Sequence, residues 1–115
     1  MLKPRREIVW FKRAKKDFNT FPEVAKDKIL DALVVAGQGD TSRLSKPLKG
    51  IGGGVFEIAV KYRKDAYRAV YALQIEKEIW VVHAFKKKSK TEIKTPKSDI
   101  DLIKARIKFL KEQMK

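Results

Sequence analysis

The chain contains no cysteine and a single histidine, His83. The absence of cysteine excludes a disulfide framework and thiolate metal sites, and it fits a reducing compartment. The close carboxylates Asp99 and Asp101 are spaced i and i+2, where the side chains of a helix do not face each other. We therefore expect neither a metal site nor a cofactor.

A long apolar run is also missing from the start of the sequence. Residues 1–16, MLKPRREIVWFKRAKK, carry charges throughout. A signal peptide or a membrane span needs an uninterrupted apolar segment, so we expect neither. The sequence thus predicts a cytoplasmic protein without membrane contact.

Positive charge is what the chain has in excess. Its 28 Lys and Arg residues against 14 Asp and Glu residues give a formal net charge of +14. This excess exceeds what solubility requires and favours a polyanionic partner, of which nucleic acid is the leading candidate. The length of 115 residues suits one domain with one modest core.

Alternating and continuous apolar runs in the middle of the chain predict an antiparallel meander. In VFEIAVKY, residues 55–62, the apolar side chains alternate with Glu57, Ala59 and Lys61, as in a half-buried strand. The runs AYRAVYALQ and IWVVHAF are almost continuously apolar, which is typical of central strands covered on both faces. Polar turns at 63–65 and 75–78 separate the three runs, and a short strand is possible at 7–10.

Helical spacing of apolar residues occupies both ends of the chain. Pro22 suits a first helical turn, Gly37 and Gly39 suit a helix stop, and Thr95 with Pro96 could form an N-cap and first helical residue. The three stripes are Phe11, Ala14, Phe18 and Phe21; Ala25, Ile29, Leu33 and Ala36; and Ile100, Ile103, Ile107, Leu110 and Met114. We expect one α+β domain over residues 1–115, with two N-terminal helices and a C-terminal helix packed on a small, curved, mainly antiparallel sheet of three to five strands.

Four motifs then carry a resemblance to a known family. They are GGGVFEI, YRAVY, HAFKKKS and TPKSDIDLIKARIK. In their order and spacing, residues 48–108 resemble the HigB-like branch of the RelE/ParE toxin superfamily, with its phage-derived host-inhibition toxins, whereas the first 47 residues match mainly as two helices.

The resemblance implies a RelE/ParE-like fold and a toxin of a type II toxin–antitoxin pair. Catalytic members of the superfamily cut messenger RNA, generally in the ribosomal decoding site, and a cognate antitoxin blocks them. In the HigB branch that antitoxin is typically a helix-turn-helix protein. The expected partners are therefore messenger RNA, the ribosome and such an antitoxin, and the toxin itself would be a monomer or a heteromer with the antitoxin.

Metal-independent RNA cleavage needs a base for the 2′-hydroxyl, positive charge beside the phosphorane and a proton for the leaving 5′-oxygen. Arg68, in the middle strand, is our first candidate, because its guanidinium fork can hold a phosphate and stabilise the transition state. The alternative is an arginine that extends from a sheet edge or pairs with Glu57 on the neighbouring strand.

A cluster of lysines follows the last expected strand, at a sheet end that a substrate can reach. Its members are Lys86, Lys87, Lys88 and Lys90. Crowded ammonium groups are suited to proton transfer and to anion binding, and we expect Lys87 or Lys88 to act in the chemistry and Lys86 and Lys90 to bind RNA. The alternative is a solvated basic loop that binds nucleic acid non-specifically.

Four further candidates each have a plain structural alternative. His83 is a candidate acid or base, but it shares a strand face with apolar residues and is then more often a hydrogen-bonded core residue. Glu57 is a candidate base or orienter of Arg68, and Tyr71 a candidate for base stacking, although such side chains on strands usually form cross-strand pairs or pack. Lys61 and Arg63, near the first turn, are expected to contact the RNA backbone.

The superfamily also contains gyrase inhibitors that share the fold and cleave nothing, so the fold by itself does not decide the activity. The combination of Arg68 with residues 83–88 matches the nuclease-type members better. Ribosome-dependent RNA cleavage is therefore our first hypothesis, gyrase inhibition the second, and a basic RNA-binding module without activity the third.

Overall fold

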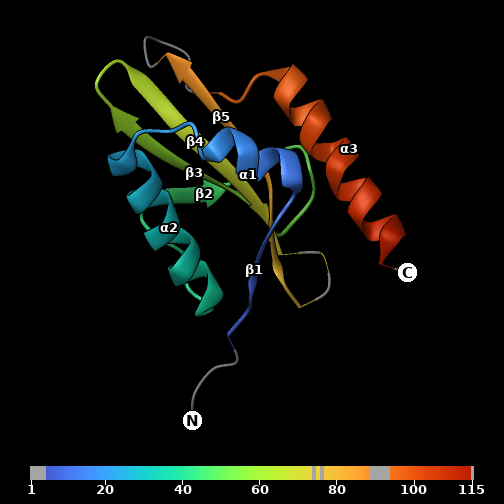
Figure 1. The fold of residues 1–115 in the computed structure, drawn as a ribbon. Helices are drawn as coiled ribbons and strands as arrows, with labels where there is room; N and C mark the ends of the chain where they lie inside the picture. The colour runs from blue at the N-terminus through green and yellow to red at the C-terminus, as the bar shows by residue number, and fades with distance from the viewer. Residues whose placement is uncertain (1–4, 74, 76, 89–93, 115) are drawn as a thin grey trace.

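The computed structural model describes residues 5–73, 75, 77–88 and 94–114. The elements follow the order β1 (Ile8–Trp10), α1 (Lys12–Phe18), α2 (Glu23–Gly37), β2 (Ser45–Pro47), β3 (Val55–Tyr62), β4 (Asp65–Ala72), β5 (Ile79–Lys88) and α3 (Lys97–Gln113). Figure 1 shows them as three helices around one sheet, which confirms the predicted α+β class. No helix in the described part of the chain is both long and apolar enough to cross a membrane.

The five strands form one sheet in the order β1-β5-β4-β3-β2. The three longest strands form the predicted meander, and β2 pairs antiparallel with β3. The short N-terminal strand β1 is also present, and it runs parallel to β5. A tight turn at Arg63 and Lys64 joins β3 to β4, with Arg63 in the left-handed region at φ 58°.

The helices cover the two faces of this sheet. On one face, here called the α1–α2 face, the buried helix residues Phe18, Ile29 and Leu33 pack against Ile58 and Tyr71 of the sheet. On the other face, the α3 face, the apolar stripe of α3 packs against strand residues. The members of this second cluster include Val55, Val70, Val82, Ile103, Ile107 and Leu110. In Figure 1, α3 stands apart from α1 and α2, on the far side of β5.

The helix starts differ by about one residue from the sequence expectation. Pro22 and Pro96 are the N-cap residues of α2 and α3, each with an extended ψ near 150°, so both helices begin one residue later. Thr95 is not the N-cap of α3, because its hydroxyl donates a hydrogen bond to Glu57 Oε2 on β3 instead. That bond ties the segment before α3 to the sheet.

Candidate functional site

The strand register brings cations from three strands onto the α3 face. Lys61 on β3 and Lys87 on β5 both lie directly opposite Ala66 on β4, so these three side chains point to the same face. Two residues further along β4, Arg68 lies opposite Ala59 and Phe85 on that face. Ala66 lies between Lys61 and Lys87, and Ala59 lies beside Arg68. No bulky side chain of β3 or β4 therefore separates the three cations.

Arg68 is buried and paired with a buried carboxylate. Its Nη1 lies 3.3 Å from Oε1 of Glu57, and the two residues are 6% and 1% exposed. The other oxygen of Glu57 accepts the hydrogen bond from Thr95. This is the pairing that the sequence offered as the alternative for Arg68, and it fixes the guanidinium between β3 and β4.

The sequence placed the lysine cluster after the last strand, but the first three of these lysines lie within β5. The strand continues to Lys88, so Lys86, Lys87 and Lys88 alternate between the two faces. Half-buried Lys87 lies on the α3 face with Arg68, whereas Lys86 and Lys88 are exposed on the α1–α2 face. Extended backbone separates neighbouring ammonium groups, and Asp65 lies directly opposite Lys88 across the strands. Lys90 lies outside the described residues.

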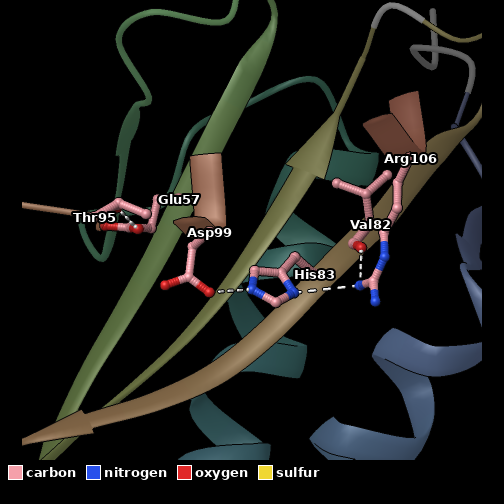
Figure 2. A network of polar contacts seen from close by, with 6 residues as sticks. All are labelled: Glu57, Val82, His83, Thr95, Asp99 and Arg106. Carbon is pink, nitrogen blue, oxygen red and sulfur yellow. Dashed lines mark hydrogen bonds and ion pairs between the residues drawn. The ribbon is translucent and has the colours of Figure 1, made fainter. Parts of the chain in front are cut away.

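His83 sits between two side chains of α3, as Figure 2 shows. Its Nε2 lies 2.7 Å from Oδ1 of Asp99, and its Nδ1 lies 3.3 Å from Nη1 of Arg106, which also donates to the carbonyl oxygen of Val82 at 2.8 Å. Because Arg106 can only donate, Nδ1 is the acceptor and Nε2–H the donor to Asp99.

The surroundings of His83 favour its neutral form. Burial lowers the pKa of its imidazole, and this effect exceeds the opposing effect of the hydrogen bond to Asp99 and of the charge of that carboxylate. The nearby charge of Arg106 lowers the pKa further. With 5% exposure and both nitrogens bonded, His83 is placed to hold α3 against β5. To act as an acid or base, His83 would first have to break its hydrogen bond with Asp99 or with Arg106.

The remaining candidates fall in three different places. Tyr71 is 1% exposed on the α1–α2 face and stacks on Phe56 with 5.4 Å between ring centroids, so the expectation that it stacks on an RNA base is wrong. Lys61 is exposed on the α3 face, where it and Lys87 lie on either side of Ala66. Arg63 lies in the β3–β4 turn with its guanidinium 5.2 Å from the centre of the Tyr62 ring, at the same end of the sheet.

Sequence reasoning missed the roles of Thr95 and Arg106 and considered Asp99 only as a metal ligand. A signal was present in α3, because Asp99 and Arg106 are seven residues apart and therefore lie on the side of the helix that also carries Ile103. Polar residues inside an apolar stripe predict buried polar partners, here His83 and the Val82 carbonyl. Within the described residues, no group of three or more His, Asp or Glu side chains could hold a metal ion.

Comparison with known proteins connects this geometry to a family. The family model described as Phage derived protein Gp49-like (DUF891) matches residues 16–108. No curated protein sequence matches the chain. Among solved structures, a double arginine-to-alanine variant of the E. coli toxin RelE in the free state superposes with a TM-score of 0.62. It is 17% identical, and the match covers 90% of this chain and 97% of that one. The predicted RelE-like fold is therefore confirmed.

Proposed function

This chain belongs to the Gp49-like family of phage-derived proteins and has the fold of the toxin RelE, and we propose from that premise that it is the toxin of a type II toxin–antitoxin pair. The proposed activity is cleavage of messenger RNA in the ribosomal decoding site, in the cytoplasm and without a metal ion. A helix-turn-helix antitoxin is the proposed inhibitor, and the toxin without it is a monomer.

The row of Lys61 and Lys87 beside Arg68 is the observation that carries the proposal. Three strands contribute one cation each to the same face, toward the end of the sheet that carries the β3–β4 turn. Positive charge fixed on a rigid sheet is what stabilises a phosphorane most effectively, because no reorganisation is needed as the negative charge develops. The net charge of +14 also favours association with the polyanionic ribosome.

In the proposed reaction, the 2′-hydroxyl of the RNA attacks the adjacent phosphorus while the bond from phosphorus to the 5′-oxygen breaks. The 2′-oxygen loses a proton and the 5′-oxygen gains one, so the products are a 2′,3′-cyclic phosphate and a 5′-hydroxyl. Lys87 is the proposed proton-transfer group, and Lys61 and Arg63 bind the RNA backbone. Arg68, oriented by Glu57, stabilises the negative charge on the phosphorane.

An in vitro translation reaction followed by primer extension tests the proposal. Discrete cuts in the message that appear only when ribosomes are present support it. Full-length message together with inhibition of gyrase supercoiling indicates the second hypothesis, a gyrase inhibitor. Full-length message without gyrase inhibition, but with retained RNA binding, indicates an RNA-binding module.

One observation favours a non-catalytic alternative. Arg68 and Glu57 are both buried, and a buried ion pair of this kind also serves simply to fix two strands in register. Under that alternative the exposed cations bind nucleic acid and Arg68 only supports the fold. The Arg68 variants described in the Discussion separate the two roles.

A further inference from the structure

A pocket of about 550 Å³ lies beside the Glu57–Arg68 pair, between β2 and the segment that leads into α3. Its size falls within the roughly 300–1,000 Å³ of small-ligand sites. Part of its lining is apolar and comes from Pro47, Leu48 and Ile100. These residues provide hydrocarbon surface against which a nucleobase can pack.

Three lysines, Lys46, Lys49 and Lys94, also line the pocket. All three are exposed, and none of them pairs with a carboxylate in the described part of the chain. The acid that lines the pocket, Glu57, already pairs with Arg68, so the three ammonium groups leave the pocket with a net positive charge that favours an anionic ligand. A phosphate group satisfies this charge, and a base attached to it satisfies the apolar wall.

Glu57 and Thr95 also line the pocket, and Glu57 is the partner of Arg68 in the proposed cleavage site. The two oxygens of Glu57 accept hydrogen bonds from Arg68 and Thr95, but a carboxylate has about four lone-pair positions, so it can accept more. A carboxylate favours the amino groups of cytosine, adenine or guanine over uracil, whose single ring N–H stands between two carbonyl oxygens.

The pocket and the proposed cleavage site lie on the same face of β3. Glu57 is four residues before Lys61, which corresponds to on the order of 13 Å along a strand. Neighbouring nucleotides of one extended RNA strand can span that length. The two places can therefore hold consecutive parts of a single substrate.

We infer that this pocket is a nucleotide subsite that binds one unit of single-stranded RNA next to the cleaved phosphate and prefers a base with an amino group. The inference rests on the proposed function in taking RNA as the source of the nucleotide. The lysines hold its phosphate, the apolar residues hold its base, and Glu57 accepts from the amino group.

Nucleoside monophosphate binding, followed through the NMR signals of the Leu48 and Ile100 methyl groups, tests the inference. Titration with CMP, AMP or GMP should shift both signals saturably, with dissociation constants at least threefold lower than that of UMP. The double variant Lys49→Ala/Lys94→Ala should weaken CMP binding at least tenfold. The matched control Lys104→Ala/Lys108→Ala removes the same charge from the exposed side of α3 and should stay within twofold of the parent.

Equal losses in the two double variants, or inorganic phosphate that binds as tightly as CMP, would overturn the subsite. A parallel cleavage assay keeps this outcome separate from the proposed function. In that assay the Lys49→Ala/Lys94→Ala variant should raise the half-saturating substrate concentration and leave the maximal rate within about threefold. Failure of the proposed function would instead appear as a parent protein that binds CMP and cuts no message.

Discussion

Nε2 of His83 lies 2.7 Å from Oδ1 of Asp99, and this contact joins the central part of the sheet to the first turn of α3. Arg106 bonds the opposite ring nitrogen from two turns further along the helix. The imidazole is therefore held in one tautomer by two residues of the same helix. Its neutral form is what the arrangement requires, because a protonated Nδ1 cannot accept from Arg106.

The neutral histidine makes the stability of the fold depend on pH. Because burial places the pKa of His83 below its ordinary 6.5, the unfolded chain takes up a proton at a higher pH than the folded chain. The contribution of His83 to the free energy of unfolding should be complete above about pH 7 and should decline as the pH falls below about 6.5. Urea unfolding at several pH values between about 8 and 5 measures it.

The variant His83→Gln is the control for this prediction. His83 is the single histidine of the chain, so in the variant no other imidazole titrates. The fall in stability between pH 7 and the folded-state pKa should be smaller in the variant than in the parent. A parent protein whose stability stays constant or rises over this range would contradict the assignment of a neutral, buried imidazole.

The sequence predicted the elements well, because their periodicity is local. The alternation in residues 55–62 and the stripe Ala25, Ile29, Leu33 and Ala36 each identified a buried face, and the structure buries those residues of α2. The lysines at the end of β5 were harder to predict. Four cations within five residues favour a loop. The strand register, in which Lys86, Lys87 and Lys88 lie opposite residues of β4, shows that β5 continues.

The site was less predictable than the fold, because it depends on which face of the sheet each residue occupies. Tyr71 and Arg68 are three residues apart on β4 and therefore point to opposite faces of the sheet. This spacing already argues against a site that contains both residues, although the prediction from the sequence named both. The partnership of Thr95 with Glu57 spans 38 residues, and no local spacing indicates it.

Removing Arg68 should damage both the fold and the activity. Arg68→Ala leaves the carboxylate of Glu57 buried beside Thr95 without its cation, which costs about 3–5 kcal/mol of stability. It should also remove on the order of 3 kcal/mol of transition-state stabilisation. Denaturant unfolding and single-turnover cleavage, both at low temperature, measure the two effects separately.

A double variant distinguishes the catalytic role of Arg68 from a structural one. Glu57→Leu with Arg68→Met replaces the buried ion pair by apolar side chains, a change that is often neutral or stabilising. We expect this protein to fold with a stability close to that of the parent and to have lost cleavage by at least a hundredfold. Cleavage at the parent rate would show that the pair only supports the sheet.

Lys87 should respond to substitution as a group that transfers a proton. Lys87→Ala should reduce single-turnover cleavage of saturated ribosome complexes by roughly a hundredfold or more. Lys87→Arg keeps the charge but cannot exchange protons near neutral pH, so it should not restore the rate. Restoration by arginine would assign Lys87 to electrostatic binding of phosphate only.

Cleavage should need no metal ion held by the protein. Protein that has been treated with a strong chelator and then separated from it should cut message on preformed ribosome complexes as fast as untreated protein. The comparison uses preformed complexes because ribosomes themselves need magnesium. A rate that is lost on chelation and restored by zinc or manganese would contradict the metal-independent reaction.

The most direct test of the central claim compares two double variants, each of which removes two lysine charges, from opposite faces of the sheet. Lys61→Ala/Lys87→Ala acts on the α3 face with Arg68, and Lys86→Ala/Lys88→Ala acts on the α1–α2 face. On saturated ribosome complexes, single-turnover primer extension should show a loss of at least about a hundredfold for the first variant. The second should stay within about threefold of the parent, because its charges contribute to association only. Equal rates for the two variants, or a larger loss for the second, would contradict a cleavage site on the α3 face.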